Sequence, residues 1–220
     1  MPSFALIAEG QTDQIIIERI IEQLYVNNLD EDVDVNFLQP LRDVTDQSRV
    51  VHAPHAGWEL VLECCRAKAK DALSANDFVV VQIDTDCGDH VNYGLPLTKD
   101  GIDRPYDELL HDGAAIIRNA IGAELFEQNS ERFLFAISVH SLESWLLLYF
   151  FNIDKTKNCF ERLNREILRK KGEGISKEIR PYQMLAREIR YRRLNELSEA
   201  PNSFGQFLRS VKSLGLQEKV

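Results

Sequence analysis

The sequence has no long hydrophobic run, and we expect no secretory signal. Its longest apolar stretch, residues 145–151, is far shorter than the roughly 20 residues that cross a bilayer as a helix. The first residues lack the basic segment and the following apolar segment of a secretory signal. We therefore expect no membrane association, and the predicted compartment is the cytoplasm.

Cysteine is scarce, and its spacing argues against a zinc site. The four cysteines are Cys64, Cys65, Cys87 and Cys159. The adjacent pair falls on a predicted helix, where neighbouring side chains point in different directions and cannot easily bind one ion. Reduced structural thiols in a reducing compartment are therefore predicted.

Basic residues are fewer than acidic residues, except in one segment. The net charge of -9 argues against nucleic-acid binding by the whole surface. Residues 155–193, however, contain 13 Lys and Arg against 5 Asp and Glu. This segment ends in an arginine cluster with a tyrosine neighbour (Arg187, Arg190, Tyr191, Arg192 and Arg193). A solvated helix face and a track for phosphate groups explain that cluster equally well.

Short apolar runs alternate with helical patterns over the first 150 residues, which predicts an α/β protein with a parallel sheet. The expected strands are residues 4–8, 33–38, 78–83 and 133–139. Helices are expected from about residue 12, with Thr12 as N-cap, over 56–73, over 106–121 and from about residue 141. The polar segment 43–55 and the Gly- and Pro-containing segment 87–104 are predicted loops.

The predicted fold is thus a Rossmann-like parallel sheet of about four strands flanked by helices, with a helical C-terminal extension. We place a domain boundary near residue 152, which gives a catalytic domain over 1–152 and a basic helical extension over 153–220 that packs on it. Helix breaks are expected in the extension at residues 172–174 and at Pro181.

Acidic residues follow three of the predicted strands. Glu9 follows the first strand, Asp84 and Asp86 follow the third, and Glu143 lies just past the fourth. The carboxyl ends of parallel strands share one edge of a sheet, so these carboxylates should meet there and repel one another. Magnesium or manganese would relieve that repulsion. One Asp after a strand is more often a turn former, but three strand ends of this kind favour a metal site.

These residues also carry a family resemblance. Residues 8–13 (Ala-Glu-Gly-Gln-Thr-Asp) resemble the Glu-Gly motif of Toprim domains, and residues 84–86 (Asp-Thr-Asp) resemble their Asp-x-Asp motif. With Asp89 and residues 141–143 (Ser-Leu-Glu), the pattern is similar to the nuclease domain of the OLD (overcoming lysogenization defect) family. Over residues 4–150, this resemblance implies a Toprim fold and a Mg²⁺- or Mn²⁺-dependent endonuclease.

The resemblance also implies roles for individual residues. The implied metal-binding set is Glu9, Asp13, Asp84, Asp86, Asp89, Ser141 and Glu143. Within it, Asp86 is either a further ligand or a support for one, and Ser141 offers its hydroxyl or orients a water. Two cations about 3.5–4 Å apart would activate water and stabilise the leaving 3′ oxygen. OLD-type enzymes place a lysine beyond the last strand, which Lys177 resembles, with Lys170 and Lys171 as competitors.

One departure from the family concerns ATP. OLD-family nucleases usually carry an ATPase domain, and no Gly-x-x-x-x-Gly-Lys-Ser/Thr motif occurs here. Residues 143–147 (Glu-Ser-Trp-Leu-Leu) are similar to small stand-alone Toprim proteins, often encoded beside an ATPase in bacterial anti-phage defence loci. The expected partners are a DNA or RNA substrate and such an ATPase, and a homo-oligomer is left open. The alternative hypothesis is a non-catalytic subunit that recruits or regulates the ATPase.

Overall fold

The computed structural model describes residues 1–29, 31–42 and 57–217, so the predicted loop over 43–55 lies outside the described residues. Its main sheet has four parallel strands in the order β2 (Asp34–Gln39), β1 (Ser3–Ile7), β3 (Phe78–Asp84) and β6 (Phe133–Ser138). The predicted α/β architecture with about four strands is therefore confirmed.

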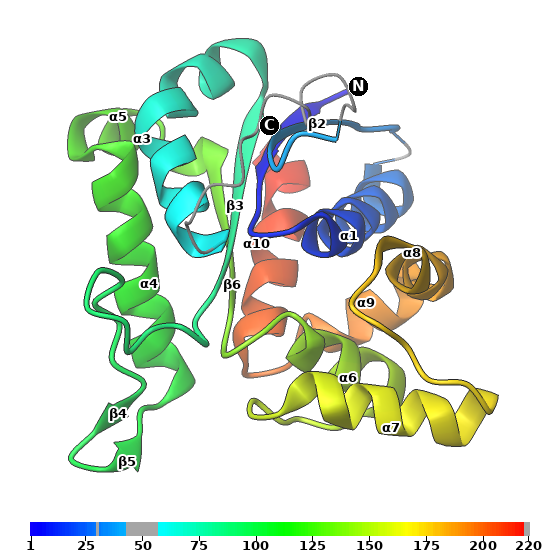
Figure 1. Cartoon of the computed structure of the whole chain (residues 1–220). Coiled ribbons are helices and arrows are strands. Elements are labelled where there is room, and N and C mark those ends of the chain that lie inside the picture. Colours follow the sequence, from blue (N-terminus) through cyan, green and yellow to red (C-terminus); the bar gives the residue numbers. More distant parts are fainter. Residues whose placement is uncertain (30, 43–56, 218–220) are drawn as a thin grey trace.

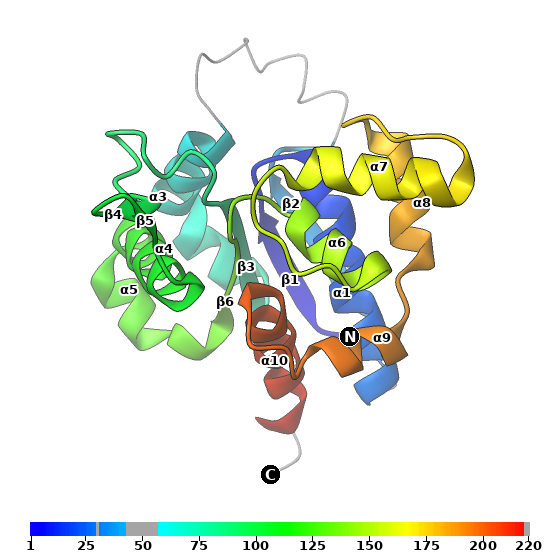
Figure 2. The same ribbon diagram turned by 90° about the horizontal axis from the view of Figure 1, so that it is seen from below.

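Helices cover both faces of this sheet (Figure 1). One face carries α3 (Gly57–Ala75), α4 (Tyr106–Ile121) and α5 (Ala123–Gln128). The other carries α1 (Gln11–Leu29), α6 (Glu143–Phe151) and α10 (Ser203–Gln217), with α7 (Cys159–Lys171), α8 (Ile179–Glu188) and α9 (Tyr191–Leu197) packed around them. Figure 2 shows the same layers from below, where the carboxyl ends of the strands lie.

Alternation along the strands separates two hydrophobic clusters. In β1, Phe4 and Leu6 belong to the cluster shared with α1, α6 and α10, whereas Ala5 and Ile7 belong to the cluster shared with α3 and α4. Because both faces are covered, β3 is apolar on both sides, with Val80 on one face and its neighbours on the other. This burial explains why the central strands occur in the sequence as continuous apolar runs.

Three predicted details are wrong. The segment predicted as one long loop contains a two-stranded antiparallel hairpin, β4 (Thr98–Lys99) and β5 (Ile102–Asp103). Its turn residues, Asp100 and Gly101, both have positive φ, as an Asp-Gly hairpin turn requires. Thr12 is not the N-cap, because α1 already begins at Gln11. Pro181 does not end a helix, because it lies in the first turn of α8, where an N–H has no intrahelical partner.

The segment beyond residue 152 packs into the same hydrophobic cluster as α1 and α6. Trp145 of α6 donates a hydrogen bond from Nε1 to Ser203 Oγ at 2.8 Å, and its ring stacks on Phe204 and Phe207 of α10. The division into two domains stays a prediction. Within the described part of the chain, no helix combines the length and apolarity that a membrane span needs.

We predict that Ser203→Ala lowers the free energy of unfolding by about 1–3 kcal/mol, because it leaves the buried Trp145 N–H without its acceptor. Urea denaturation followed by tryptophan fluorescence measures this loss. Ser213→Ala, at an exposed position of the same helix, is the control and should change stability by less than about 0.5 kcal/mol. Equal losses in the two variants would contradict the prediction.

Candidate active site

The parallel topology brings two of the predicted ligands into direct contact. Glu9 follows β1, and Asp84 is the last residue of the neighbouring strand β3. The backbone N–H of Asp84 donates a hydrogen bond to Glu9 Oε1 at 2.7 Å. The first and third strand ends are thereby joined at the carboxyl edge of the sheet.

Gln82, which the sequence analysis did not single out, fixes both of these residues. The backbone N–H of Glu9 donates to Gln82 Oε1 at 3.0 Å, and Gln82 Nε2 donates to Asp84 Oδ1 at 2.8 Å. The Gln82 side chain is fully buried. The signal that could have identified it is a glutamine inside an apolar strand, because a buried amide needs partners.

Asp13 reaches the same place from the first turn of α1. Its carboxylate accepts hydrogen bonds from the backbone N–H groups of Gly10 and of Asp13 itself, which satisfies donors at the start of the helix. Burial and the charge of Glu143 raise the pKa of Asp13 to about 7, although the two backbone hydrogen bonds and the charge of Lys177 lower it in part. Asp13 therefore lies within the electrostatic reach of both Glu143 and Lys177.

Burial and mutual repulsion dominate the electrostatics of the site. Burial raises the pKa of Asp84 well above its usual value, and the charges of four other carboxylates raise it further (Asp13, Glu9, Glu143 and Asp86). Burial likewise raises the pKa of Glu9 to about 8, against the lowering effect of the Asp84 N–H. Asp84 and these four residues make a set of five carboxylates, and none of them has an ion-pair partner among the described residues. We call these five residues the carboxylate cluster.

Tyrosines hold two members of the carboxylate cluster. The Tyr182 hydroxyl of α8 donates a hydrogen bond to Glu143 Oε1, and Tyr182 is only 1% exposed. Burial and the charge of Glu143 raise the pKa of the Tyr182 hydroxyl, so it remains a donor at neutral pH. The Tyr93 hydroxyl donates to the backbone carbonyl of Asp84 at 2.7 Å. Neither tyrosine was predicted, because both reach the site through tertiary packing.

Gly57 leaves room for Glu9 at the start of α3. A Cβ atom on Gly57 would lie 3.0 Å from Glu9 Oε2 and 3.1 Å from Glu9 Cβ. The Glu9 carboxylate therefore lies against the N-terminal end of a 19-residue helix, where the helix dipole favours negative charge.

The three candidate lysines occupy different places. Lys177 lies close enough to Asp13 for its charge to lower the pKa of that carboxyl, and its Nζ lies 5.1 Å from the centre of the Phe160 ring. Lys171 forms an ion pair with Glu188. Lys170 lies over the ring of Phe151. Of the three lysines, only Lys177 is among the charges that shift the pKa of Asp13, which associates it, rather than its two competitors, with the carboxylate cluster.

The remaining predicted residues are placed less centrally. Asp86 is exposed, and its backbone N–H donates to the His140 carbonyl at 3.0 Å. Asp89 uses Oδ1 to accept the backbone N–H of Leu97 at 2.9 Å, and it shapes the loop after β3. Ser141 lies in the turn before α6, where its carbonyl accepts the N–H of Ser144. The charge of Asp86 thus acts on the cluster, whereas neither Asp89 nor Ser141 forms a hydrogen bond or ion pair with the cluster among the described residues.

The chemistry of this donor set fits a hard divalent cation. All donors are carboxylate oxygens, which Mg²⁺ and Mn²⁺ prefer. Glu9, Asp84 and Glu143 each use one oxygen to accept a protein hydrogen bond, and the second oxygen of each has no hydrogen bond to another described residue. In the arrangement seen here, no three His, Cys, Asp or Glu side chains within residues 1–29, 31–42 and 57–217 form a group that could hold a metal ion.

Comparison with models of protein families, with curated proteins and with solved structures finds no match to this chain. The observed architecture, a parallel four-stranded sheet between helices, is compatible with a Rossmann-like fold. The resemblance to Toprim and OLD-family proteins therefore rests on the sequence motifs and stays a prediction.

Without divalent cations, we predict that the protein loses stability as pH rises from about 4.5 to 8. The folded-state pKa of Glu9 is raised from 4.5 to about 8, so between these values the folded state holds a proton that the unfolded state has released. The stability that the protonated Glu9 carboxyl contributes is fully present below pH 4.5. It is lost as pH rises through the folded-state pKa. Urea denaturation in EDTA at several pH values measures the loss.

The matched variants are Glu9→Gln, which removes the titrating group, and Glu63→Gln, at an exposed position of α3. Stability should fall less steeply with pH in Glu9→Gln than in the parent, and equally steeply in Glu63→Gln. A slope unchanged in Glu9→Gln would show that the carboxyl of Glu9 does not titrate in this range.

Proposed function

We propose that this chain is a Mg²⁺- or Mn²⁺-dependent nuclease that hydrolyses phosphodiester bonds of DNA or RNA. The observation that carries the proposal is the carboxylate cluster, in which half-buried acidic side chains from the ends of β1 and β3 and the start of α1, with the buried Glu143 of α6, repel one another. Buried charges are ordinarily paired or bind metals. Because no described residue forms an ion pair with these carboxylates, bound cations are the best candidates for the missing positive charge.

The residues of the chain have separable roles in this proposal. Glu9, Asp13, Asp84 and Glu143 would hold the cations, with the exposed Asp86 at the rim. Gln82 and Tyr182 orient the carboxylates, since each donates to one carboxylate oxygen. Bound divalent cations would supply the charge that activates the attacking water and stabilises the leaving oxygen.

Lys177 adds a positive charge beside Asp13 without being buried. An exposed ammonium group next to the carboxylate cluster is suited to neutralise the phosphate that is cleaved. This arrangement agrees with the lysine beyond the last strand that the OLD-family resemblance implies. An ATPase partner and a role in bacterial anti-phage defence are parts of the proposal that rest on the same resemblance.

We predict that the purified protein cleaves plasmid DNA or structured RNA with added Mn²⁺, alone or together with the ATPase partner that the resemblance implies. Asp84→Asn should reduce cleavage more than about 100-fold, because even residues that only support metal ligands are commonly worth about 10–100-fold. Asp103→Asn is the control, because Asp103 is exposed and pairs with Lys157. Absence of cleavage both alone and with the ATPase would favour the non-catalytic subunit, and equal activity of the two variants would exclude the carboxylate cluster as the site.

A second prediction separates the lysines. Lys177→Gln should lower kcat for cleavage while Mn²⁺ affinity stays within about threefold, because the charge that it removes would act on the substrate phosphate. Lys171→Gln is the matched control, since its ammonium group pairs with Glu188. Cleavage assays with a metal titration measure both quantities. A larger loss in Lys171→Gln than in Lys177→Gln would reverse the assignment.

A further inference from the structure

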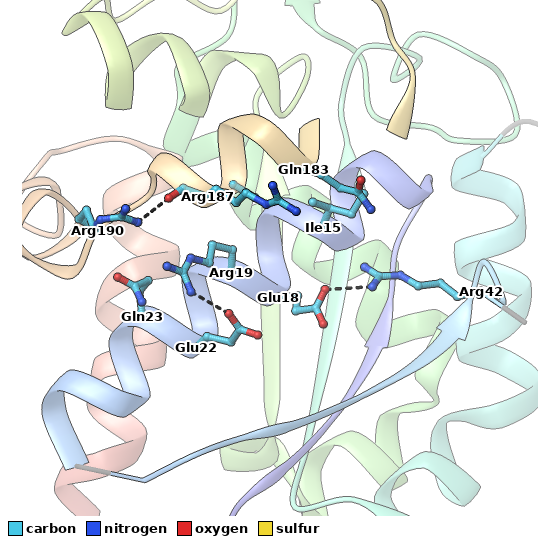
Figure 3. Close-up of a pocket in the computed structure, with 10 residues that line it drawn as sticks. Ile15, Glu18, Arg19, Glu22, Gln23, Arg42, Gln183, Arg187 and Arg190 are labelled. Carbon is cyan, nitrogen blue, oxygen red and sulfur yellow. Dashed lines mark hydrogen bonds and ion pairs between the residues drawn. The ribbon is translucent and has the colours of Figure 1, made fainter. Parts of the chain in front are cut away.

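A groove of about 660 Å³ lies between α1 and α8 (Figure 3). Its charged lining consists of Glu18, Arg19, Glu22, Arg42, Arg187 and Arg190. Figure 3 shows Arg187 extending from α8 across α1, while Arg42 approaches from the segment after β2. The groove thus collects arginines from parts of the chain that lie far apart in the sequence.

Positive charge exceeds negative charge in this groove. Arg42 Nη1 pairs with Glu18 Oε2 at 3.0 Å, and Arg19 Nη1 pairs with Glu22 Oε2 at 3.1 Å. These two ion pairs neutralise both glutamates and hold their arginines in place. Among the described residues, Arg187 and Arg190 have no carboxylate partner.

Hydrogen-bonding capacity also remains in the groove. Arg19 Nε and Arg42 Nη2 are buried and have no hydrogen-bond partner among the described residues. Arg190 donates hydrogen bonds from Nη1 to the backbone carbonyls of Arg187 and Ile189. The Arg187 side chain forms no hydrogen bond with another described residue. Arg19 Nε and Arg42 Nη2 are closed to solvent, whereas the exposed guanidinium groups of Arg187 and Arg190 are open to an anionic ligand with several oxygens.

The two helices that form the groove also lead to the carboxylate cluster. Asp13 lies in the first turn of α1, and Glu22 lies nine residues further along the same helix. At about 1.5 Å per residue this separation is about 14 Å. One strand of a duplex advances about 3.4 Å per nucleotide along the axis, so the groove reaches about four nucleotides away from the cluster at Glu22, while its near end begins at Ile15. On α8, Tyr182 contacts Glu143 and Arg187 lines the groove.

The arginines that lie close together at residues 187–193 of the sequence have different surroundings in the structure. Arg193 donates to the Leu148 carbonyl and to Asn152 Oδ1 at the end of α6, so it has a structural role. Arg192 pairs with Glu196. Only Arg187 and Arg190 of that cluster line the groove, together with two arginines that the sequence analysis did not connect to them.

We propose that this groove binds the phosphodiester backbone of the nucleic-acid substrate, a few nucleotides from the bond placed at the carboxylate cluster. The proposal rests on the proposed function, and it assigns the recognition of the flanking strand to Arg187 and Arg190. Contacts of this kind set affinity and position without selecting a base sequence.

The test uses the Asp84→Asn protein, which should bind without cleaving, and fluorescent single-stranded DNA and RNA of 20 nucleotides, roughly five times the separation estimated from the spacing above. Fluorescence anisotropy gives the affinity at several salt concentrations between about 50 and 300 mM. Adding Arg187→Gln and Arg190→Gln should weaken binding more than about tenfold at the lowest salt and reduce the salt slope by about 1–2, since each phosphate contact on a single strand contributes about 0.7.

Two further variants serve as controls. Arg169→Gln alters an exposed arginine of the same basic segment that pairs with Glu166, and it should leave affinity within about twofold. Arg187→Gln alone should give about half of the change in slope. Because the Arg187 side chain is exposed and has no described hydrogen bond, this variant should keep the parent's thermal midpoint.

The outcomes separate the groove from the proposed function. Binding that depends on Arg187 and Arg190, in a protein whose parent cleaves neither DNA nor RNA alone or with the ATPase partner, would support the groove proposal and overturn the nuclease proposal. If the parent cleaves nucleic acid but the double variant shows unchanged affinity and salt slope, the nuclease proposal stands and the groove proposal is overturned. Binding of neither nucleic acid at the lowest salt would overturn the groove as well.

Discussion

The desolvation of several carboxylates at one edge of the sheet is the constraint on which the rest of the site depends. Parallel pairing of β1 with β3 brings Glu9 to the backbone of Asp84, and burial then raises the pKa of both side chains. Hydrogen bonds fix one oxygen of each carboxylate but do not remove the repulsion between them. A bound cation would offset this repulsion, and the buried partners around the site would keep the ligands in place.

The segment beyond residue 152 completes the site rather than lying apart from it. It supplies Tyr182, which holds Glu143, and Lys177, whose charge acts on Asp13. The same segment also lines the groove between α1 and α8 with Arg187. Packing of α8 along α1 therefore places both the groove and two partners of the carboxylate cluster, Asp13 and Tyr182, on the same pair of helices.

Much of the fold could be predicted, because strands buried on both faces are continuous apolar runs and the acidic residues directly follow them. The convergence of Glu9 and Asp84 follows from the rule that parallel strands end at one edge. A glutamine inside an apolar strand could have pointed to Gln82. Tyr182 and Gly57 could not be assigned to the site from local patterns, because their contacts depend on tertiary packing. The hydrogen bond that Asp89 Oδ1 accepts from the Leu97 N–H could not be predicted from motif spacing either, and the role of Asp89 as a ligand stays a prediction.

The most direct measurement is anomalous diffraction from crystals of the protein soaked in MnCl₂. The account predicts a manganese peak in contact with the carboxylates of Glu9 and Asp84, and the loss of that peak in Asp84→Asn crystals. It also predicts that the Gln82 and Tyr182 hydrogen bonds persist around the bound ion. A peak located only elsewhere, or no peak at the carboxylate cluster in well-diffracting crystals, would contradict the claim that these carboxylates form a metal centre.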